Sequence, residues 1–262
     1  MIVTLTTDFG HSDPFAGILK GVILGLAPEA EVIDLTHAIP AGDIMQGALA
    51  LDAALDYFPP GTIHLAVVDP GVGGPRKPVA AEVENALLVG PDNGLFTAVL
   101  ARRPMRRAVA LTSSRYHLQP TSRTFHGRDI FAPAAAQLVR GVPLEELGEA
   151  VAELHTIDLP QPVVDKNGID AHILHVDHFG NLVTDLTYAG LCAWQQDGHE
   201  HLSITAGDVR IYEISGTFSD VAPGRPVAYF GGSTRLEIAV RQGNAAAKFN
   251  LGIGATVRVE RR

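Results

Sequence analysis

The stretch of the sequence with the clearest chemical potential is a glycine-rich loop that follows an apolar run at residues 62–68. It reads VVDPGVGGPR over residues 67–76, so a carboxylate, Asp69, and a guanidinium, Arg76, flank three glycines. Glycine carries no side chain and tolerates left-handed backbone, which is typical of a loop that another group approaches closely. The chemistry open to Asp69 and Arg76 depends on what that group is.

Three interpretations of this loop are open. A phosphate cradle would use the exposed N–H groups and Arg76 to bind an anion, but the loop lacks a Gly-Lys-Ser/Thr ending and Asp69 would repel a phosphate. A structural turn is the commonest origin of a glycine-rich segment. A catalytic loop would direct Asp69 and Arg76 at a small reactant. The spacing of the residues does not distinguish these interpretations.

A second segment, TSRTFHGRD at residues 121–129, adds a candidate for acid–base chemistry. His126 is followed by Gly127 at the entrance of an expected helix, and histidine is the side chain that titrates most readily near neutral pH. A lone histidine is more often structural, but together with Asp69 and Arg76 it forms a plausible catalytic set.

Metal binding is a weaker hypothesis. Asp69, His126 and Asp129 are suitable ligand types, yet the sequence has no HxH, HExxH or CxxC spacing. A second group of histidines is interpreted as lining a strand and its exit rather than binding metal: His172, His175 and His178. We therefore predict no metal site.

The first half of the chain alternates strand-like and helix-like segments. Strands are expected at 2–7, 31–36 and 62–68, with helices at 15–26, after an Asp13-Pro14 cap, and at 43–57. This alternation predicts a mainly parallel sheet with right-handed crossovers, extended by a hairpin from VAAEV and ALLVG, and a further helix over 129–141. Ligands of such sheets bind at the carboxyl ends of the strands, which here carry Asp8, His37 and Asp69.

The second half has a different character. A proline-rich and polar segment near residues 155–168 precedes seven short alternating runs: AHILHVD, NLVTDLT, HLSITA, DVRIYEI, RPVAYF, LEIAV and TVRVE. Such runs, separated by turn residues, predict a small antiparallel barrel or sandwich. We expect an α/β sandwich domain over residues 1–160 and a β-barrel domain over residues 168–262.

Composition narrows the classes of partner and compartment. The 262 residues carry a net charge of −9 with no long run of Lys and Arg, which argues against nucleic acid or an anionic membrane as a partner. The N-terminus enters an apolar strand without a signal peptide, no apolar run is long enough to span a membrane, and Cys192 is the only cysteine. A cytoplasmic protein is therefore expected.

Seven ordered motifs resemble the S-adenosyl-L-methionine hydroxide adenosyltransferases, relatives of the fluorinating and chlorinating enzymes that use the same substrate. These motifs are TLTTDFG, VIDLTH, FPPGTIHLAVVDPGVG, PDNGLFT, TFHGRDIFAPAAAQL, VDHFGNLVT and GGSTRLEIAV. The resemblance extends from residue 2 to about residue 255. It implies an N-terminal α/β domain, a C-terminal β-barrel and a homotrimer whose sites lie between subunits. The implied reaction is hydrolysis of S-adenosyl-L-methionine to adenosine and L-methionine, without a cofactor.

The resemblance also implies roles for individual residues. Asp69, Arg76 and His126 match the catalytic set, in which Arg76 stabilises an attacking water or hydroxide while Asp69 and His126 orient it and accept its proton. The implied substrate-binding residues are Asp8 at the ribose, Asp13 and Asp177 near the methionine amine, Phe179 and Asn181 around the nucleoside, and Ser233 at the methionine carboxylate.

Departures from the halogenating relatives bear on the reaction. Those relatives carry tyrosines where this chain has Asp69 and His126, and Asp69 would repel a halide, so water is the expected nucleophile. Gly42 and Val183 replace tryptophans, which leaves Phe218 as a candidate aromatic wall for the adenine. Halogenation of the substrate, or a sensor that binds S-adenosyl-L-methionine or adenosine without catalysis, are the alternative functions.

Overall fold

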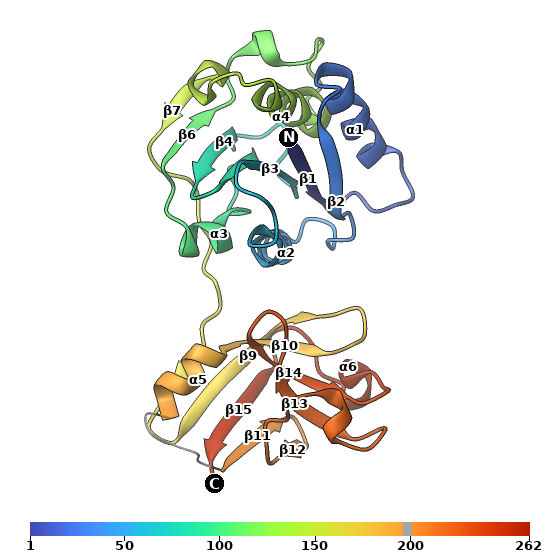
Figure 1. Cartoon of the computed structure of the whole chain (residues 1–262), viewed down its shortest axis with the longest axis vertical. Coiled ribbons are helices and arrows are strands. Elements are labelled where there is room, and N and C mark those ends of the chain that lie inside the picture. Colours follow the sequence, from blue (N-terminus) through green and yellow to red (C-terminus); the bar gives the residue numbers. More distant parts are fainter. Residues whose placement is uncertain (196–200) are drawn as a thin grey trace. The chain divides into compact units, whose positions relative to one another are not determined.

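The computed structural model describes residues 1–195 and 201–262. The chain divides into two compact units, Met1–Leu159 and Pro160–Arg262 (Figure 1). No helix in the described ranges is both long enough and apolar enough to cross a membrane.

The N-terminal unit is built on a seven-stranded sheet. Its strands are β1 (Ile2–Thr7), β2 (Glu31–Thr36), β3 (Thr62–Val67), β4 (Pro78–Val83), β5 (Ala86–Pro91), β6 (Arg107–Ala110) and β7 (Glu149–Val151). Their spatial order is β2-β1-β3-β5-β4-β6-β7. The first four strands of this order pair in parallel, whereas β5–β4, β4–β6 and β6–β7 pair antiparallel. The sheet is therefore mixed, and the prediction of a mainly parallel sheet was wrong for its second half.

The hairpin predicted from VAAEV and ALLVG explains the change of direction. Val83 pairs with Ala86, so just two residues connect β4 to β5, and Asn85 adopts a φ of 63°. A connection this short can join antiparallel neighbours but not parallel ones. The second strand of the hairpin, β5, lies beside β3, and β4 begins the antiparallel part of the sheet.

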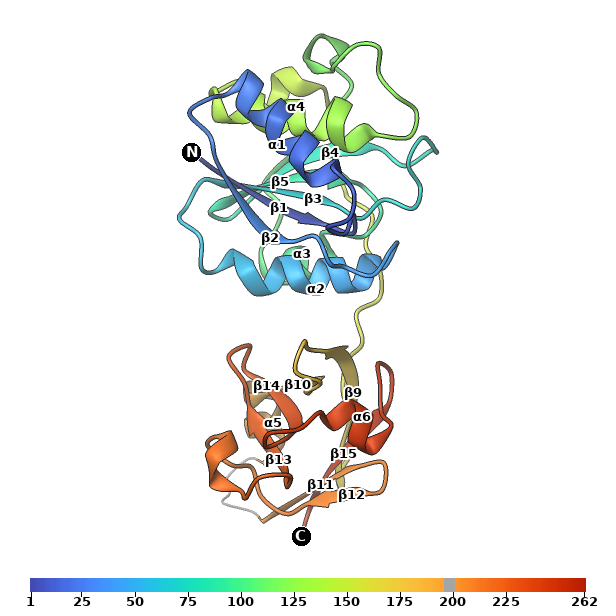
Figure 2. The same cartoon turned by 90° about the vertical axis from the view of Figure 1, so that its right-hand side faces the viewer.

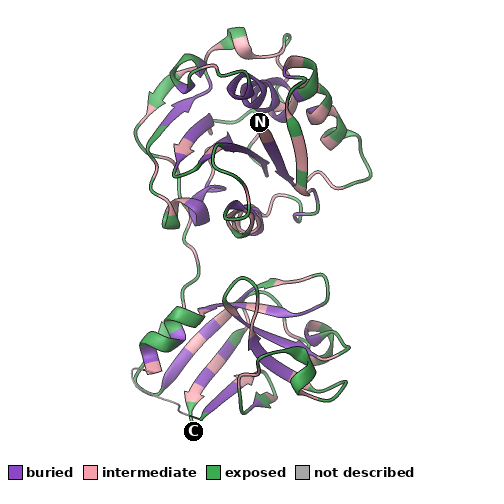
Figure 3. Cartoon of the chain, in the orientation of Figure 1, coloured by how far each residue is buried: buried purple, intermediate pink, exposed green. Residues whose placement is uncertain are grey.

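Helices cover both faces of this sheet, as the alternating pattern predicted. Figure 2 shows α1 (Phe15–Leu26) and α4 (Ala132–Val139) on one face and α2 (Ile44–Leu55) and α3 (Thr97–Arg102) on the other. Each face has its own apolar core, and all six residues of β3 are buried between the two cores (Figure 3). A strand buried on both faces is a rigid support for the loop that follows it.

The two expected helix caps have different outcomes. Asp43 caps α2, because its side chain accepts a hydrogen bond from the N–H of Gln46 at 3.0 Å. Asp13 does not cap α1, so this prediction was wrong. The helix begins at Phe15 as expected, but Pro14 rather than Asp13 occupies the cap position, and the carbonyl of Pro14 accepts from the N–H of Ile18 at 2.9 Å.

The helix expected over 129–141 begins with a wider turn. Residues Gly127–Phe131 form a π-helical turn, and α4 follows from Ala132. Pro133 lies in the first turn of α4 and supplies no N–H to the preceding turn; the carbonyl of Asp129 accepts instead from the N–H of Leu118 at 2.9 Å. Wide turns of this kind often occur at functional sites.

The C-terminal unit is an eight-stranded antiparallel sheet that closes almost into a barrel. Its strands are β8 (Val163–Val164), β9 (Gly168–Val176), β10 (Leu182–Thr187), β11 (Leu202–Ala206), β12 (Val209–Ile211), β13 (Pro226–Phe230), β14 (Arg235–Val240) and β15 (Thr256–Arg261). Their order is β12-β11-β15-β9-β10-β14-β13, with β8 paired to β9. All seven runs predicted from the sequence contain a strand of this sheet. Two short helices were not predicted: α5 (Tyr188–Gln195) and α6 (Ala245–Phe249).

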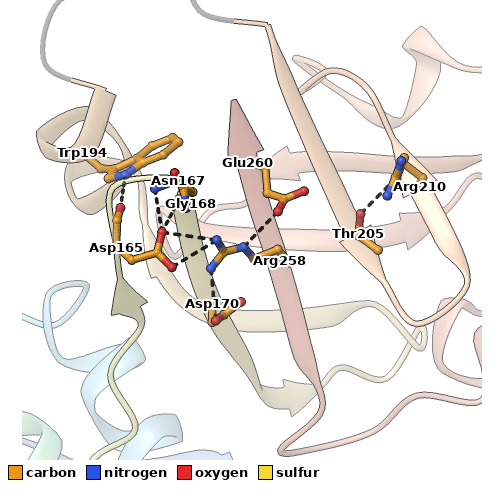
Figure 4. A network of polar contacts seen from close by, with 9 residues as sticks. All are labelled: Asp165, Asn167, Gly168, Asp170, Trp194, Thr205, Arg210, Arg258 and Glu260. Atoms are coloured by element: carbon orange, nitrogen blue, oxygen red, sulfur yellow. Dashed lines mark hydrogen bonds and ion pairs between the residues drawn. The ribbon is translucent and has the colours of Figure 1, made fainter. Parts of the chain in front are cut away.

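A polar network ties the start of β9 to β15 in this unit (Figure 4). Arg258 of β15 contacts Asp165 at 3.2 Å, Asp170 at 3.1 Å and Glu260 at 3.4 Å. The indole N–H of Trp194 donates to the carbonyl of Asp165 at 2.9 Å. Each polar group of this network contacts another member, so we interpret it as structural.

Candidate active site

The structure brings Asp69, Arg76 and His126 together at the carboxyl end of β3. The guanidinium of Arg76 donates to both carboxylate oxygens of Asp69, from Nε to Oδ1 at 2.9 Å and from Nη2 to Oδ2. Nη2 also lies 2.8 Å from Nδ1 of His126. The side chains of Arg76 and Asp69 are 8% and 6% exposed, so this charge pair is largely removed from water. A buried, bidentate pair of this kind is geometrically well defined.

The contact with Arg76 determines how His126 is protonated. A guanidinium has no lone pair to offer and can act only as a donor, so Nδ1 of His126 must accept and any ring proton of the neutral form lies on Nε2. Burial and the positive charge of Arg76 both lower the pKa of His126 below its ordinary value of 6.5, against the smaller opposing effects of Asp69 and Asp129. His126 is therefore a neutral acceptor near pH 7.

We expect this protonation state to be visible by NMR. The His126 imidazole should titrate below pH 6.5, and Arg76→Gln should raise its pKa because the adjacent positive charge is lost. Because the folded state binds this proton less readily than the unfolded state, the contribution of His126 to the free energy of unfolding should fall as the pH falls below 6.5. Nitrogen-15 shifts of the ring would check both points, and titration above 6.5 in the unmodified chain would contradict the assignment.

The structure explains why one residue of the loop, Gly73, is a glycine. Gly73 adopts a φ of 76°, and a Cβ at this position would lie 2.4 Å from the carbonyl oxygen of Arg123. The group that approaches the loop closely at Gly73 is therefore the backbone of Arg123, three residues before His126. The structural and catalytic interpretations of the loop are thus compatible, because the close approach of the two segments is what brings His126 to Arg76.

Two supporting residues were not singled out from the sequence. The ring of Phe131, in the π-helical turn, lies under the guanidinium of Arg76 with 5.6 Å to the ring centroid, a cation–π arrangement. The side-chain amide of Asn93 donates to the carbonyl of Val68 at 2.9 Å and holds the end of β3 just before Asp69. Asn93 and Phe131 lie in the motifs PDNGLFT and TFHGRDIF, so the motifs already included these residues even though no role was predicted for them.

Asp8 lies at the end of β1, the strand that pairs in parallel with β3. Its Oδ2 accepts a hydrogen bond from the N–H of Gly42 at 2.8 Å. Gly42 has a φ of 74°, and a Cβ there would lie 3.6 Å from Pro70. The loops that carry Asp8, Gly42 and Asp69 therefore converge at one edge of the sheet.

Asp13 is exposed and lies just before α1, beside an aromatic cluster of Phe9, Phe15 and Phe125.

Asp129 has a structural role that competes with metal binding. Its carboxylate is 1% exposed, accepts from the N–H of Ser122 at 2.7 Å and forms two hydrogen bonds with Arg128. Within residues 1–195 and 201–262, no group of three His, Cys, Asp or Glu side chains is arranged to hold a metal ion. His172 contacts the buried carboxylate of Asp185 at 3.0 Å.

The C-terminal unit brings Asp177 and Asn181 together in the turn between β9 and β10. The carboxylate of Asp177 accepts from the N–H groups of Phe179 and Asn181 at 2.9 and 2.8 Å and from the amide of Asn181 at 2.8 Å. Phe179, in the same turn, is 72% exposed. A large apolar side chain held outward by an ordered turn is a suitable surface for a planar ligand.

Ser233 lies in the turn between β13 and β14 and is exposed. Below this turn the buried Glu237 accepts a hydrogen bond from the hydroxyl of Tyr229, and burial together with the charge of Asp177 raises the pKa of Glu237. The ring of Phe218 lies 4.6 Å from that of Tyr229. Tyr229 and Glu237 were not predicted as site residues. A contact between Phe218 and an adenine remains a prediction.

An Asp–Arg–His cluster with a largely buried Asp–Arg pair, at the strand ends of an α/β unit, is the kind of site that an enzyme acting on small substrates carries. Models of the SAM hydroxide adenosyltransferase N-terminal domain and C-terminal domain match residues 3–148 and 171–258. The chain therefore belongs to the SAM hydroxide adenosyltransferase family, and the resemblance seen in the sequence is confirmed.

Individual relatives agree with this assignment. The chain is 40% identical to an (R)-S-adenosyl-L-methionine hydrolase of Salinispora tropica, over 98% of this chain and 97% of the relative. It is 39% identical to an (R)-S-adenosyl-L-methionine hydrolase of Thermus thermophilus, over 98% of each chain. A fluorinase of Nocardia brasiliensis is more distant, at 25% identity over 99% of this chain and 96% of the relative. The crystal structure of an uncharacterised conserved protein from Thermotoga maritima matches with a TM-score of 0.93 and 31% identity, over all of both chains.

Proposed function

We propose that the protein hydrolyses (R)-S-adenosyl-L-methionine to adenosine and L-methionine. The observation that carries this proposal is the buried Arg76 that bridges Asp69 and His126, in a chain about 40% identical to relatives named for this activity. The configuration at sulfur is taken from the names of those relatives.

The reaction places its main demand on the nucleophile. Water attacks C5′ of the substrate, an oxygen–carbon bond forms, and the carbon–sulfur bond breaks with its electron pair moving to sulfur. The sulfonium becomes a neutral thioether, so the leaving group needs no proton. One proton must leave the attacking water, and a positive group must stabilise the developing charge on its oxygen.

Arg76 is suited to the second task. Its Nη1 is buried and, among the described residues, has no hydrogen-bond partner, while its other nitrogens bind Asp69 and His126. We assign Nη1 to the attacking oxygen. Asp69 is the proton acceptor in this proposal, because Nδ1 of His126 is already occupied by Arg76. His126 then orients the guanidinium, a narrower role than the sequence suggested.

Substrate-binding roles follow the resemblance. Asp8 binds the ribose hydroxyls, Asp13 and Asp177 the methionine amine, Phe179 and Asn181 the nucleoside, and Ser233 the methionine carboxylate. The convergence of Asp8 and Asp69 at neighbouring strand ends supports a ribose next to the reacting carbon. The hydrogen bonds between Asp177 and Asn181 support an ordered turn as the binding surface in the C-terminal unit.

Halogenation is the second candidate, because fluorinases are among the relatives. The nearly buried carboxylate of Asp69 argues against it, since a desolvated halide beside this group would be repelled. A sensor without catalysis would not need a largely buried Asp69–Arg76 pair in contact with His126.

Incubation of the purified protein with each sulfonium epimer in water enriched in oxygen-18 tests this function. We expect adenosine labelled at its 5′-oxygen from the (R) epimer, with an unchanged rate after exhaustive chelation because no step needs a Lewis acid. Unlabelled adenosine would contradict attack by water, and efficient formation of a 5′-halogenated product in the presence of chloride or fluoride would favour halogenation. A loss of activity that zinc or magnesium restores would contradict the metal-free mechanism.

We also propose that the active form is a homotrimer in which the C-terminal unit of one subunit completes the site of another. This follows the resemblance, and its support is that the proposed substrate-binding residues are divided between two units. Light scattering at assay concentration should give three times the mass of one chain. An active monomer would rule the proposal out.

A further inference from the structure

The carboxylate of Asp8 is held from one side by the loop that follows β2. Its Oδ2 accepts from the N–H of Gly42 at 2.8 Å, whereas Oδ1 has no hydrogen-bond donor among the described residues. An oxygen free of protein donors can accept from a ligand hydroxyl, provided that the backbone on both sides of Asp8 is fixed. What fixes that backbone is therefore part of the binding site.

His37 connects the residues on both sides of Asp8. Its ring Nδ1 lies 2.8 Å from Oγ1 of Thr7, the residue before Asp8. Its backbone carbonyl accepts from the N–H of Gly10, two residues after Asp8, at 2.8 Å. His37 is 2% exposed, so these contacts are shielded from water.

The protons of this group can be assigned from its neighbours. Nε2 of His37 lies 3.0 Å from Oδ1 of Asp34, at hydrogen-bonding distance but without hydrogen-bonding alignment, and a carboxylate there favours a proton on Nε2. Nδ1 then accepts from the hydroxyl of Thr7. The same oxygen of Thr7 accepts from the N–H of Phe9 at 3.2 Å. The N–H of Phe9 therefore donates to the hydroxyl oxygen of Thr7, and that hydroxyl donates to Nδ1 of His37. These two hydrogen bonds fix the turn that contains Asp8.

We propose that His37 is a positioning residue for ribose binding, acting through Thr7 and Gly10 on the carboxylate of Asp8. This inference rests on the proposed function, in which Asp8 accepts from the ribose hydroxyls. It predicts a defect in binding and not in the chemical step, because among the described residues the side chain of His37 contacts Thr7, Asp34 and His11 rather than the Asp69–Arg76–His126 cluster.

The same strand offers a matched control. Oγ1 of Thr4 lies 2.7 Å from Nδ1 of His64, a second buried threonine–histidine pair between β1 and a neighbouring segment. Thr4 and His64 are 0% and 1% exposed, close to the burial of Thr7 and His37. This pair lies in the middle of the sheet rather than at the end of β1. Removing it should cost stability without moving Asp8.

Calorimetric titration with adenosine, together with single-turnover rates at saturating substrate, tests the proposal. His37→Ala and Thr7→Val should each weaken adenosine binding by about tenfold, the loss expected for one well-placed hydrogen-bonding group, with single-turnover rates within about threefold of the unmodified chain. His37→Asn should recover most of the affinity, because its side-chain oxygen can accept from Thr7. Thr4→Val and His64→Asn should bind adenosine within about twofold of the unmodified chain.

The outcomes separate this inference from the proposed function. Unchanged affinity in His37→Ala and Thr7→Val, or equal losses in Thr7→Val and Thr4→Val, would overturn the positioning role while leaving hydrolysis intact. Failure of the unmodified chain to bind adenosine would overturn the proposed function and this inference with it. If His37→Ala does not fold, Thr7→Val, which removes one hydroxyl at nearly constant volume, still decides the question.

Discussion

Arg76→Ala should lower the single-turnover rate by about 100-fold or more while changing substrate affinity little. The guanidinium stabilises charge on the attacking oxygen, and that charge is absent from the bound sulfonium, so its loss affects the transition state more than the ground state. Binding could even improve, because a positive charge near the sulfonium is removed. Calorimetric affinities and quench-flow rates would measure the two effects separately.

Two further variants make this test specific. Arg76→Lys keeps the charge but cannot reach Asp69 and His126 with several fixed donors at once, so it should also be slow. Arg258→Ala removes another arginine with three acidic neighbours, in the C-terminal unit, and should leave turnover within about twofold. A normal single-turnover rate in Arg76→Ala, combined with lost binding, would show that this residue holds substrate rather than stabilising the transition state.

Gly73→Ala should be strongly damaging to both stability and turnover. An added Cβ would lie 2.4 Å from the carbonyl oxygen of Arg123, so the loop over residues 69–76 and the segment that carries His126 must separate. We expect turnover to fall by more than about tenfold, because a small displacement of catalytic groups has a large effect on rate. Denaturant unfolding and steady-state kinetics would measure both consequences.

Gly61→Ala is the control for this variant. Gly61 has a φ of 86°, similar to the 76° of Gly73, but no atom lies within 4 Å of its added Cβ. Both variants incur the cost of an alanine in the left-handed region, about 1–2 kcal/mol. Only the close contact differs between them. Equal losses of turnover in the two variants would mean that backbone strain, rather than the contact with Arg123, is responsible.

Local patterns in the sequence were sufficient for the elements that carry the site. The strands before Asp8 and Asp69 were identified because β-branched, apolar runs end at turn residues, and α1 was predicted at its observed bounds of residues 15–26. The antiparallel hairpin of β4 and β5 was predicted, but the antiparallel pairing of β6 and β7 beyond it was not, because it depends on how the hairpin docks onto β3. Pairing of this kind is set by tertiary contacts and not by the strands themselves.

Which residues form the catalytic set could be predicted from the sequence, but which of them contact each other could not. Asp69, Arg76 and His126 were chosen by residue type and resemblance, and the structure places them in contact. That Arg76 lies between the other two, and so occupies Nδ1 of His126, depends on distances of a few ångströms across fifty residues of chain. Phe131 and Asn93 were missed for the same reason, since an aromatic ring and an amide in those motifs are equally typical of an ordinary core or turn.

The position of Phe131 relative to Arg76 depends on the number of residues in the π-helical turn at residues 127–131 as well as on their types. His126 and Phe131, five residues apart, both contact Arg76. On a regular α-helix, residues at this separation point about 140° apart, so they could not serve one guanidinium so directly. The extra residue in the turn rotates Phe131 back toward His126. Related chains could therefore change many side chains here and keep the arrangement, whereas a single-residue deletion would dismantle it.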